Sequence, residues 1–124
     1  MLPLLEDDLL PLLLATAEGR LAKLPPPRHH SGACAGVVLA SAGYPGQYAT
    51  GFPISGLEDL PEGVLAFHAG TKDADGHIVT SGGRVLTLVA RGPDLATARR
   101  RAYDGVERVR FAGKAFRPDI ADTR

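Results

Sequence analysis

The sequence predicts an α+β fold: an antiparallel β-meander sheet with an N-terminal apolar helix and a second helix after the meander. Three observations support this: a leucine-rich opening, a middle of short apolar runs separated by Gly, Pro and Asp turns, and a later run with helical periodicity. A chain of 124 residues fits one domain. Its 14 acidic and 14 basic residues balance, so no polyanion-binding surface is indicated and we expect no nucleic-acid partner.

The opening segment, Leu2 to Leu24, is predicted to be one helix. Asp7 or Asp8 could cap its N-terminus, and Pro11 is tolerated if it falls in the first turn. The leucines cover more than one narrow helix face, which predicts contact with something outside this sequence. Met1 is followed by acidic residues rather than a basic region, and no run is long enough to span a bilayer, so we expect no membrane partner and a cytoplasmic location.

A proline run, 25–27, ends this helix and predicts an extended linker over residues 25–33. His29 and His30 follow, but neighbours in an extended segment point opposite ways and no third ligand is suitably spaced, so no metal site is predicted. The single cysteine, Cys34, excludes an intramolecular disulfide and is expected to pack with its apolar neighbours.

From residue 34 onward, apolar runs predict the strands of the sheet. Asp75-Gly76 predicts a hairpin turn because it supplies the positive φ angles that such turns need, and Gly82-Gly83 predicts another turn. The predicted strands are Cys34 to Ala42, Val64 to Thr71, His77 to Thr80 and Arg84 to Ala90.

The second helix is predicted to open at Gly92-Pro93-Asp94, where Pro and Asp suit a helix N-terminus. The run Arg99 to Arg101 lies mainly off the apolar stripe, so a solvated face is favoured over a nucleic-acid surface. The stripe is formed by Leu95, Ala98, Ala102, Val106 and Val109.

Two turns of the meander carry groups that could bind a phosphate. Phosphate recognition needs fixed positive charge, hydroxyl donors and backbone N–H groups that no Cβ shields. Ordinary surface charges beside hairpin turns would give the same pattern, and a regular meander would separate Lys72 from Arg84 by about 13 Å. The candidate phosphate-binding residues are Lys72, Thr80, Ser81, Gly82, Gly83 and Arg84. No catalytic residue is predicted, because neither a nucleophile–base arrangement nor a nucleotide fingerprint is found.

A further turn, Gly43, Tyr44, Pro45 and Gly46, has two interpretations. It is either a tight turn fixed by tyrosine packing or a loop whose backbone faces a substrate.

Several of these segments resemble, in order and at natural spacing, the C-terminal domain of the glycinamide ribonucleotide synthetase (phosphoribosylamine–glycine ligase) family. The matching segments are Val37 to Ser41, Gly43 to Gly46 with Tyr48, His68 to Lys72, Thr80 to Leu86, Ala102-Tyr103 and Arg117 to Ile120. The opening residues 2–9 resemble the helix that follows the ATP-grasp core of these enzymes.

The resemblance implies a ligase of purine biosynthesis that joins glycine to 5-phosphoribosylamine, using ATP with Mg or Mn. It implies a C-terminal, rudiment-single-hybrid-like domain over residues 34–124 that packs on the ATP-grasp core and walls the substrate site. Residues 1–24 would then continue from that core. In related enzymes a Lys and an Arg of the corresponding meander hold the ribose 5-phosphate, and these match Lys72 and Arg84.

The sequence departs from the family pattern at several points. The acidic and Asn metal ligands, the Gly-rich N-terminal loop and the ATP-binding lysines have no counterpart in these 124 residues, so we expect no metal or cofactor site in this chain and no ligation by it alone. Thr50 replaces a basic residue and Ala121 replaces a glycine. The alternatives are a non-catalytic binding or interaction module that retains the fold, and a stand-alone phosphate-ester binder.

Overall fold

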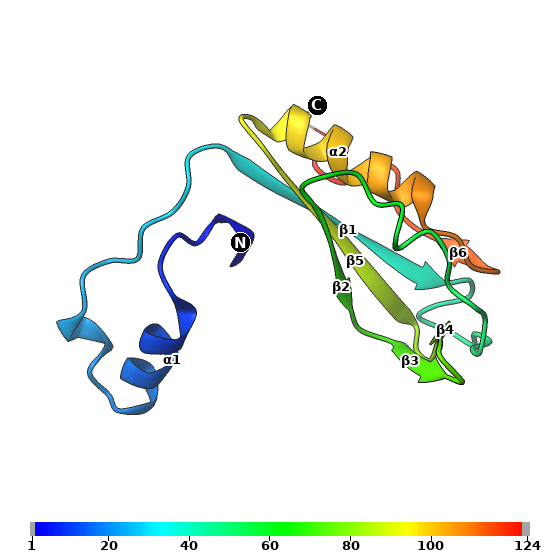
Figure 1. Cartoon of the computed structure of the whole chain (residues 1–124), viewed down its shortest axis with the longest axis horizontal. Coiled ribbons are helices and arrows are strands. Elements are labelled where there is room, and N and C mark those ends of the chain that lie inside the picture. Colours follow the sequence, from blue (N-terminus) through cyan, green and yellow to red (C-terminus); the bar gives the residue numbers. More distant parts are fainter. Residues whose placement is uncertain (1, 123–124) are drawn as a thin grey trace.

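A computed structural model describes residues 2–122 of the chain. Figure 1 shows a sheet with α2 on one side and an N-terminal segment beside this α/β body. An α+β fold with an antiparallel sheet and two α-helices is confirmed.

Met1 and the last two residues of the predicted 34–124 domain lie outside the described range. The elements are η1 (Leu2–Leu4), α1 (Leu9–Ala17), η2 (Leu21–Lys23), β1 (Ala33–Ser41), β2 (Val64–His68), β3 (Thr71–Ala74), β4 (His77–Thr80), β5 (Arg84–Gly92), α2 (Leu95–Arg108) and β6 (Lys114–Ala115).

The main sheet has four antiparallel strands in the order β2-β5-β1-β6. Its centre is the long pairing of β1 with β5, whose register shifts between Leu39 and Ala40. Val85 is the extra residue at this bulge, so Arg84 lies opposite Ala40. Leu39 is fully buried against α2, and side chains alternate between sheet faces, so Ala40 and Arg84 belong to the other face.

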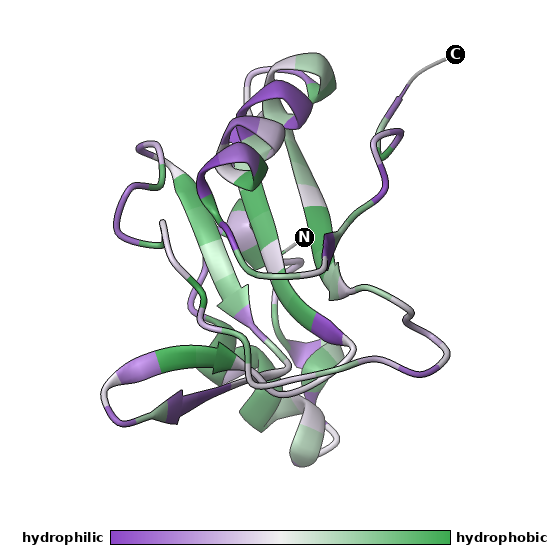
Figure 2. Ribbon diagram, turned by 90° about the vertical axis from the view of Figure 1, so that its right-hand side faces the viewer, coloured by the Kyte–Doolittle hydropathy of each residue, from purple (hydrophilic) through white to green (hydrophobic). Residues whose placement is uncertain are grey.

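One face of the sheet is covered by α2. Ala98, Ala102, Val106 and Val109 have no exposed surface, which confirms the predicted helix stripe. Figure 2 shows the contrast between the hydrophobic strands and the hydrophilic outward side of α2. The sheet residues in this core are Ala35, Val37, Leu39, Val64, Val85, Leu86, Leu88 and Ala90.

The opposite side of the sheet, here called the open face, has no covering helix. The register places Gly36, Val38, Leu65, Phe67, Thr87 and Val89 on it, with Arg84 and Arg91 at its two ends. Leu65 and Phe67 are 47% and 44% exposed, although both are large and apolar. An antiparallel sheet that faces water normally carries polar residues on that side.

The strands do not pair in simple meander order. β2 pairs with β5, and the β3–β4 hairpin between them forms a separate two-stranded sheet. The strand expected over residues 64–71 breaks before Thr71 because Gly70 crosses Gly82 closely: a Cβ at Gly70 would lie 2.7 Å from the Gly82 Cα. The predicted hairpin turn is present, with φ angles of 53° at Asp75 and 81° at Gly76.

The single helix expected over residues 2–24 is wrong, because the segment forms η1, α1 and η2 instead. Asp8 is the helix cap, since its carboxylate accepts from the Leu10 N–H at 3.0 Å. Asp7 is held by Arg28, whose backbone N–H and guanidinium donate to its carboxylate at 2.6 and 2.7 Å. Pro11 lies in the first turn of α1, as predicted.

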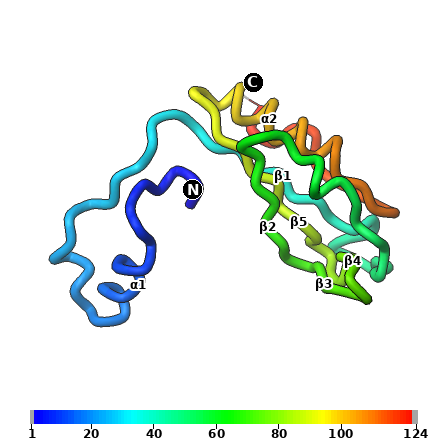
Figure 3. The backbone as a smooth tube through the Cα atoms, in the orientation of Figure 1, coloured from blue at the N-terminus to red at the C-terminus, as the bar shows by residue number. Residues whose placement is uncertain are grey.

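These contacts fold residues 2–30 back on themselves. Leu5 forms an isolated antiparallel bridge with His29, and Figure 3 shows the extended stretch that then leads into β1. The backbone N–H of Arg28, followed by its side chain, lowers the pKa of the Asp7 carboxyl. No helix within residues 2–122 combines the length and apolar character needed to cross a bilayer.

The C-terminal tail is anchored on α2. The Tyr103 hydroxyl donates to the Arg117 carbonyl at 2.6 Å and accepts from the Ile120 N–H at 3.1 Å. The Arg99 guanidinium donates to the Pro118 and Ile120 carbonyls at 2.8 and 3.0 Å. The segment Arg117 to Ile120 therefore has a structural role as the part of the tail that α2 holds.

Candidate functional site

A hollow of about 500 Å³ lies at the end of the open face where β5 begins. The bulge at Val85 turns Arg84 toward it, and the Tyr44 ring forms part of its wall. The site, called the Tyr44–Arg84 hollow, is lined by Val38, Tyr44, Ala69, Gly70, Gly83, Arg84 and Thr87.

The wall of this hollow is a close contact between Tyr44 and Gly83. A Cβ at Gly83 would collide with the Tyr44 ring, so only glycine allows the ring to lie there. Tyr44 is itself 43% exposed, and its ring centroid lies 6.1 Å from that of Tyr48. The Tyr44–Pro45 peptide bond is cis. The loop predicted from Gly43 to Gly46 thus contributes the Tyr44 side chain to the hollow.

The Gly82-Gly83 turn is fixed from β1. The Ser41 hydroxyl donates to the Gly82 carbonyl at 3.0 Å, and the Ser41 N–H donates to the Gly83 carbonyl at 2.8 Å. Gly82 also contacts Gly70: a Cβ at Gly70 would lie only 2.7 Å from the Gly82 Cα, and one at Gly82 would lie 3.1 Å from the Gly70 Cα. Close packing, of Gly82 against the Gly70 backbone and of Gly83 against the Tyr44 ring, therefore accounts for this glycine pair.

The other predicted phosphate-binding residues do not all reach the hollow. Lys72 is exposed on β3 and is not among the lining residues. The nearest backbone link is at Gly70, whose N–H donates to the Arg84 carbonyl at 2.8 Å. Lys72 is only two residues beyond Gly70, about 7 Å along the backbone.

Thr80 and Ser81 lie in different environments. Thr80 has no exposed surface, and its hydroxyl oxygen accepts from the Phe52 N–H at 3.1 Å, so this side chain holds the 51–52 segment rather than facing solvent. Ser81 is exposed, and its N–H donates to the Gly70 carbonyl at 2.8 Å.

The charge of the hollow is positive. Among residues 2–122, no carboxylate lies within ion-pair distance of Arg84 or Lys72. A guanidinium without a carboxylate partner keeps its planar set of donors for an anion, and it fits a phosphate or carboxylate through two parallel hydrogen bonds. The hollow can therefore bind an anionic group at Arg84, beside the Tyr44 side chain.

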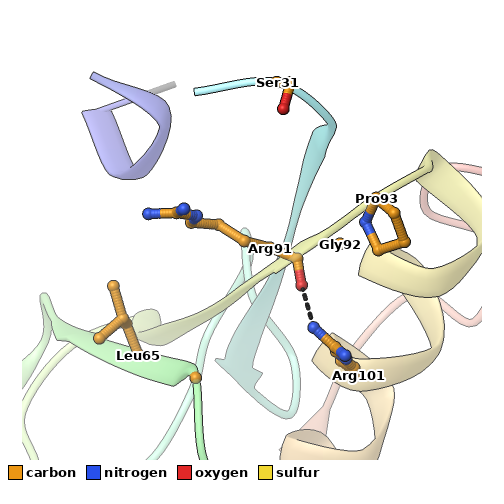
Figure 4. A pocket seen from close by; sticks show the side chains of 7 residues that line it. Ser31, Leu65, Arg91, Gly92, Pro93 and Arg101 are labelled. Atoms are coloured by element: carbon orange, nitrogen blue, oxygen red, sulfur yellow. Dashed lines mark hydrogen bonds between the residues drawn. The ribbon is translucent and has the colours of Figure 1, made fainter. Parts of the chain in front are cut away.

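A second hollow of about 460 Å³ contains two arginines but does not bring them together. Figure 4 shows the Arg91 guanidinium pointing away from Arg101, and the Arg101 guanidinium donates to the Arg91 carbonyl at 3.0 Å. Arg91 instead donates to the Pro3 carbonyl at 3.2 Å. Two guanidiniums that do not converge make this hollow a weaker anion site than the one at Arg84.

The described part of the chain, residues 2–122, holds no group of three His, Cys, Asp or Glu side chains that could bind a metal. His68, which the sequence places in an apolar strand, is exposed, and its Nδ1 lies 2.9 Å from the Thr71 hydroxyl.

Sequence reasoning missed Val38 and Thr87 as lining residues and Leu65 and Phe67 as surface residues. Alternation along β2 predicts only that Leu65 and Phe67 share a face opposite to that of Val64 and Ala66, and since all four are apolar it does not show which pair is exposed. The run looked uniformly apolar, and such a run is usually assigned to a strand buried on both faces.

Comparisons with known proteins point to one family. A family model described as "Phosphoribosylglycinamide synthetase, C domain" matches residues 34–123. The chain is 52% identical over 118 residues to a phosphoribosylamine–glycine ligase of Phenylobacterium zucineum, covering 94% of this chain and 28% of that protein. It is 44% identical over 121 residues to the trifunctional purine biosynthetic protein adenosine-3 of Gallus gallus, covering 97% of this chain and 12% of that protein.

A solved structure gives the same result. The crystal structure of a phosphoribosylamine–glycine ligase from Thermotoga maritima is similar to this chain with a TM-score of 0.72 and 40% sequence identity. The match covers 87% of this chain and 27% of that one. The chain therefore spans little more than a quarter of the ligases that it resembles.

Proposed function

This chain belongs to the phosphoribosylglycinamide synthetase C-domain family, and from that premise we propose that it acts as the C-terminal portion of a phosphoribosylamine–glycine ligase. The complete enzyme joins glycine to 5-phosphoribosylamine in purine biosynthesis in the cytoplasm. ATP and its Mg or Mn ion are held by the part of the enzyme that this chain does not contain. Residues 34–124 wall the substrate site and are inactive alone.

The observation that carries this proposal is the Tyr44–Arg84 hollow. It offers a guanidinium that no carboxylate among residues 2–122 neutralises, in a concave site of about 500 Å³ at the edge of the sheet. A sugar phosphate carries the charge and the oxygen geometry that such a group recognises. Arg84 is the proposed principal contact with the ribose 5-phosphate.

Lys72 is the proposed second contact. Its side chain must reach back from β3 toward the hollow, a distance that the flexible four-carbon stem of a lysine can bridge. Ser81, which is exposed in the turn beside Arg84, offers its hydroxyl to the same phosphate, and Gly82 and Gly83 contribute by shaping this turn against Gly70 and the Tyr44 ring. Thr80 contributes indirectly: its buried hydroxyl oxygen accepts from the Phe52 N–H, which holds the strand that leads into this turn.

The experiment is a chimera in which this chain replaces the aligned portion of the Phenylobacterium zucineum ligase. Arg84→Ala should raise the KM for phosphoribosylamine by about 10- to 150-fold, the equivalent of ~1.5–3 kcal/mol for a hydrogen bond to a charged group. The KM values for ATP and glycine should stay unchanged. Arg100→Ala, at an exposed position of α2, is the matched control.

Two results would count against the phosphate role. An equal rise in the KM for ATP would show that Arg84 maintains the domain contact instead. An unchanged KM for phosphoribosylamine would show that Arg84 does not touch the substrate.

The alternative function, a non-catalytic interaction module, is favoured by one observation: the open face exposes Leu65 and Phe67. An active chimera would reject it, because a module that had lost its substrate contacts could not restore turnover that depends on phosphoribosylamine.

A further inference from the structure

The Tyr44–Arg84 hollow is larger than a phosphate group requires. Its volume is about 500 Å³, whereas a water molecule takes up ~30 Å³ in the liquid and a phosphate only a few times as much. Pockets that hold whole small ligands measure roughly 300–1,000 Å³. The hollow therefore has room for a ligand in which a phosphate is one end of a larger molecule.

The lining of the hollow is charged at one point and largely apolar elsewhere. Arg84 is the one cation among the described residues that line it, and no Asp or Glu is among them. Val38, Ala69 and the Tyr44 ring supply apolar surface, and Thr87 supplies a hydroxyl. Val38 is 39% exposed, so this apolar surface is open to solvent. Such side chains offer a sugar few hydrogen-bond partners, but a flat aromatic group would be favourably buried on them.

The Tyr44 ring is held in place and still exposed. A Cβ at Gly83 would meet the Cδ2 and Cε2 atoms of the ring first, and the plane of the Tyr48 ring is tilted by 59° from that of Tyr44. These neighbours fix the ring, yet 43% of Tyr44 stays exposed. Nucleotide bases stack on exposed aromatic side chains, whatever the identity of the base. Tyr44 therefore offers a stacking surface for one base.

This stacking surface lies beside the cation. Gly83, which contacts the Tyr44 ring, directly precedes Arg84, and consecutive Cα atoms are about 3.8 Å apart. In a nucleoside monophosphate the ribose separates the base from the phosphate, so one molecule can reach both a guanidinium and a neighbouring ring.

The charge of the hollow selects among nucleotide ligands. One guanidinium matches one phosphate group, which favours a monophosphate over a triphosphate. A nucleic-acid strand fits less well, because strands bind along basic grooves with several stacking residues, and the 14 acidic and 14 basic residues of this chain balance. A single nucleotide is therefore the ligand that this charge favours.

We propose that the Tyr44–Arg84 hollow binds a nucleoside monophosphate, with its phosphate on the Arg84 guanidinium and its base stacked on the Tyr44 ring. This goes beyond the proposed contact with phosphoribosylamine, because that substrate has no base. Both ligands use Arg84, so a bound nucleotide excludes the substrate phosphate from the hollow, a consequence that rests on the proposed function.

The second hollow lacks this combination of groups. Figure 4 shows Arg91 and Arg101 there, but no aromatic side chain is among the described residues that line it. Arg91 lies seven residues along β5 from Arg84, about 23 Å away. Arg91→Ala is therefore the matched control for Arg84→Ala and should leave nucleotide binding unchanged.

The experiment is a titration of the chain with AMP, ribose 5-phosphate or adenosine, followed by NMR of the tyrosine ring signals. AMP adds a base to ribose 5-phosphate and a phosphate to adenosine, so the three ligands separate the two contacts. The chain has 3 tyrosines, and a Tyr44 variant identifies the signals of that ring. AMP should shift these signals upfield and bind about 5- to 150-fold more tightly than ribose 5-phosphate, the range that one stacked base contributes.

Substitutions assign each contact. Arg84→Ala should weaken AMP and ribose 5-phosphate alike, by about 10- to 150-fold. Tyr44→Leu keeps an apolar wall without the ring, so it should weaken AMP by about 5- to 150-fold and ribose 5-phosphate by less than about threefold. Tyr44→Phe keeps the ring and should retain AMP binding. Phe67→Leu removes a ring that is 44% exposed outside the hollow and should change neither affinity.

Equal Kd values for AMP and ribose 5-phosphate would overturn the proposal, and this comparison needs no variant, so it decides even if Tyr44→Leu does not fold. AMP binding that is unchanged in folded Tyr44→Leu would also overturn it. Ribose 5-phosphate should displace AMP from the chain, and simultaneous binding of both would show that AMP does not place its phosphate on Arg84.

Failure of this proposal and failure of the proposed function are distinguishable. If AMP binds no more tightly than ribose 5-phosphate while Arg84→Ala still raises the KM for phosphoribosylamine in the chimera, the nucleotide proposal is wrong and the substrate contact stands. If Arg84→Ala abolishes AMP binding but leaves that KM unchanged, the substrate contact is wrong and nucleotide binding stands.

Discussion

Replacing Lys114 by Met should destabilise the α/β body at the C-terminal end of α2. The Lys114 ammonium donates to the Val106 and Val109 carbonyls at 2.9 and 2.8 Å. The last carbonyls of a helix have no intrahelical donor, and a cation at this end is also favourably placed in the field of the helix dipole. The Lys114 ammonium also lies 5.6 Å from the centroid of the Phe116 ring, so Met removes this cation–π contact together with the two hydrogen bonds while keeping an unbranched apolar side chain of similar length.

The size of this effect follows from two opposing contributions. A hydrogen bond from a charged donor contributes ~1.5–3 kcal/mol, so two such bonds are worth about 3–6 kcal/mol before other costs. Burial lowers the pKa of Lys114, which shows that desolvation of the ammonium opposes the gain. We therefore expect a net loss of about 1–2 kcal/mol in the free energy of unfolding. For a domain of this size that corresponds to a decrease in Tm of about 4–10 °C.

The assay is urea unfolding followed by far-UV circular dichroism, with the slope of the transition checked for constancy. Lys23→Met, at an exposed position of η2, is the matched control and should change the free energy of unfolding by less than about 0.5 kcal/mol. The reasoning fails if Lys114→Met is as stable as the unmodified chain, or if the control loses as much.

Three further predictions concern a backbone angle, an ion pair and the hollow. Ala121 has a φ of 56°, a left-handed conformation that costs an L-residue about 1 kcal/mol, so Ala121→Gly should raise the Tm slightly in a thermal scan. Arg28 lowers the pKa of the Asp7 carboxyl, so the Asp7–Arg28 ion pair stabilises the fold above the usual carboxyl pKa range, and this stabilisation is lost as the pH falls through the lowered pKa. The NMR signal of the Arg28 Nε–H should therefore move toward that of a free guanidinium below about pH 4, and Asp7→Asn should abolish this change. Gly83→Ala should displace the Tyr44 ring from the hollow, which increased acrylamide quenching of tyrosine fluorescence would detect; unchanged quenching would contradict the packing described for that wall.

The parts of the fold that the sequence predicted well are those with local causes. β1, β5 and α2 begin and end within about two residues of the predicted positions, because turn residues, a proline and an Asp cap mark their limits. The Asp94 carboxylate accepts from the Thr97 N–H at 2.7 Å, the contact that the cap pattern predicts. The Asp75-Gly76 turn was equally predictable from its composition.

The errors have causes that lie far apart in the sequence. The helix expected over residues 2–24 begins only after Asp8, because distant residues hold the segment before it: the Arg28 N–H donates to the Asp7 carboxylate, and the His30 N–H donates to the Leu4 carbonyl. The order of the strands could not be read from spacing, because it depends on Gly70 and Gly82 crossing each other. None of these contacts leaves a periodic signal in the sequence.

The candidate site was predicted in part. Arg84 and Tyr44 were both named from the sequence, but forty residues separate them, and only the pairing of β1 with β5 brings them into one hollow. Lys72 and Thr80 were grouped with Arg84 because they are close in the chain. The structure separates them because the β3–β4 hairpin leaves the main sheet, and because Thr80 points into the interior.

The glycine pair beside Arg84 fits the sequence pattern of a phosphate site, but close packing explains its glycines. Gly82 and Gly83 suggested backbone N–H groups arranged around an anion, yet the Tyr44 ring excludes a side chain at Gly83, and close contact with Gly70 favours glycine at Gly82. The capacity of this site to bind an anion therefore rests on the free guanidinium of Arg84, and the glycines act indirectly by letting Tyr44 complete the wall. It follows that Gly83→Ala should weaken phosphoribosylamine binding in the chimera only as far as it moves Tyr44, whereas Arg84→Ala should weaken it with the Tyr44 ring still in place.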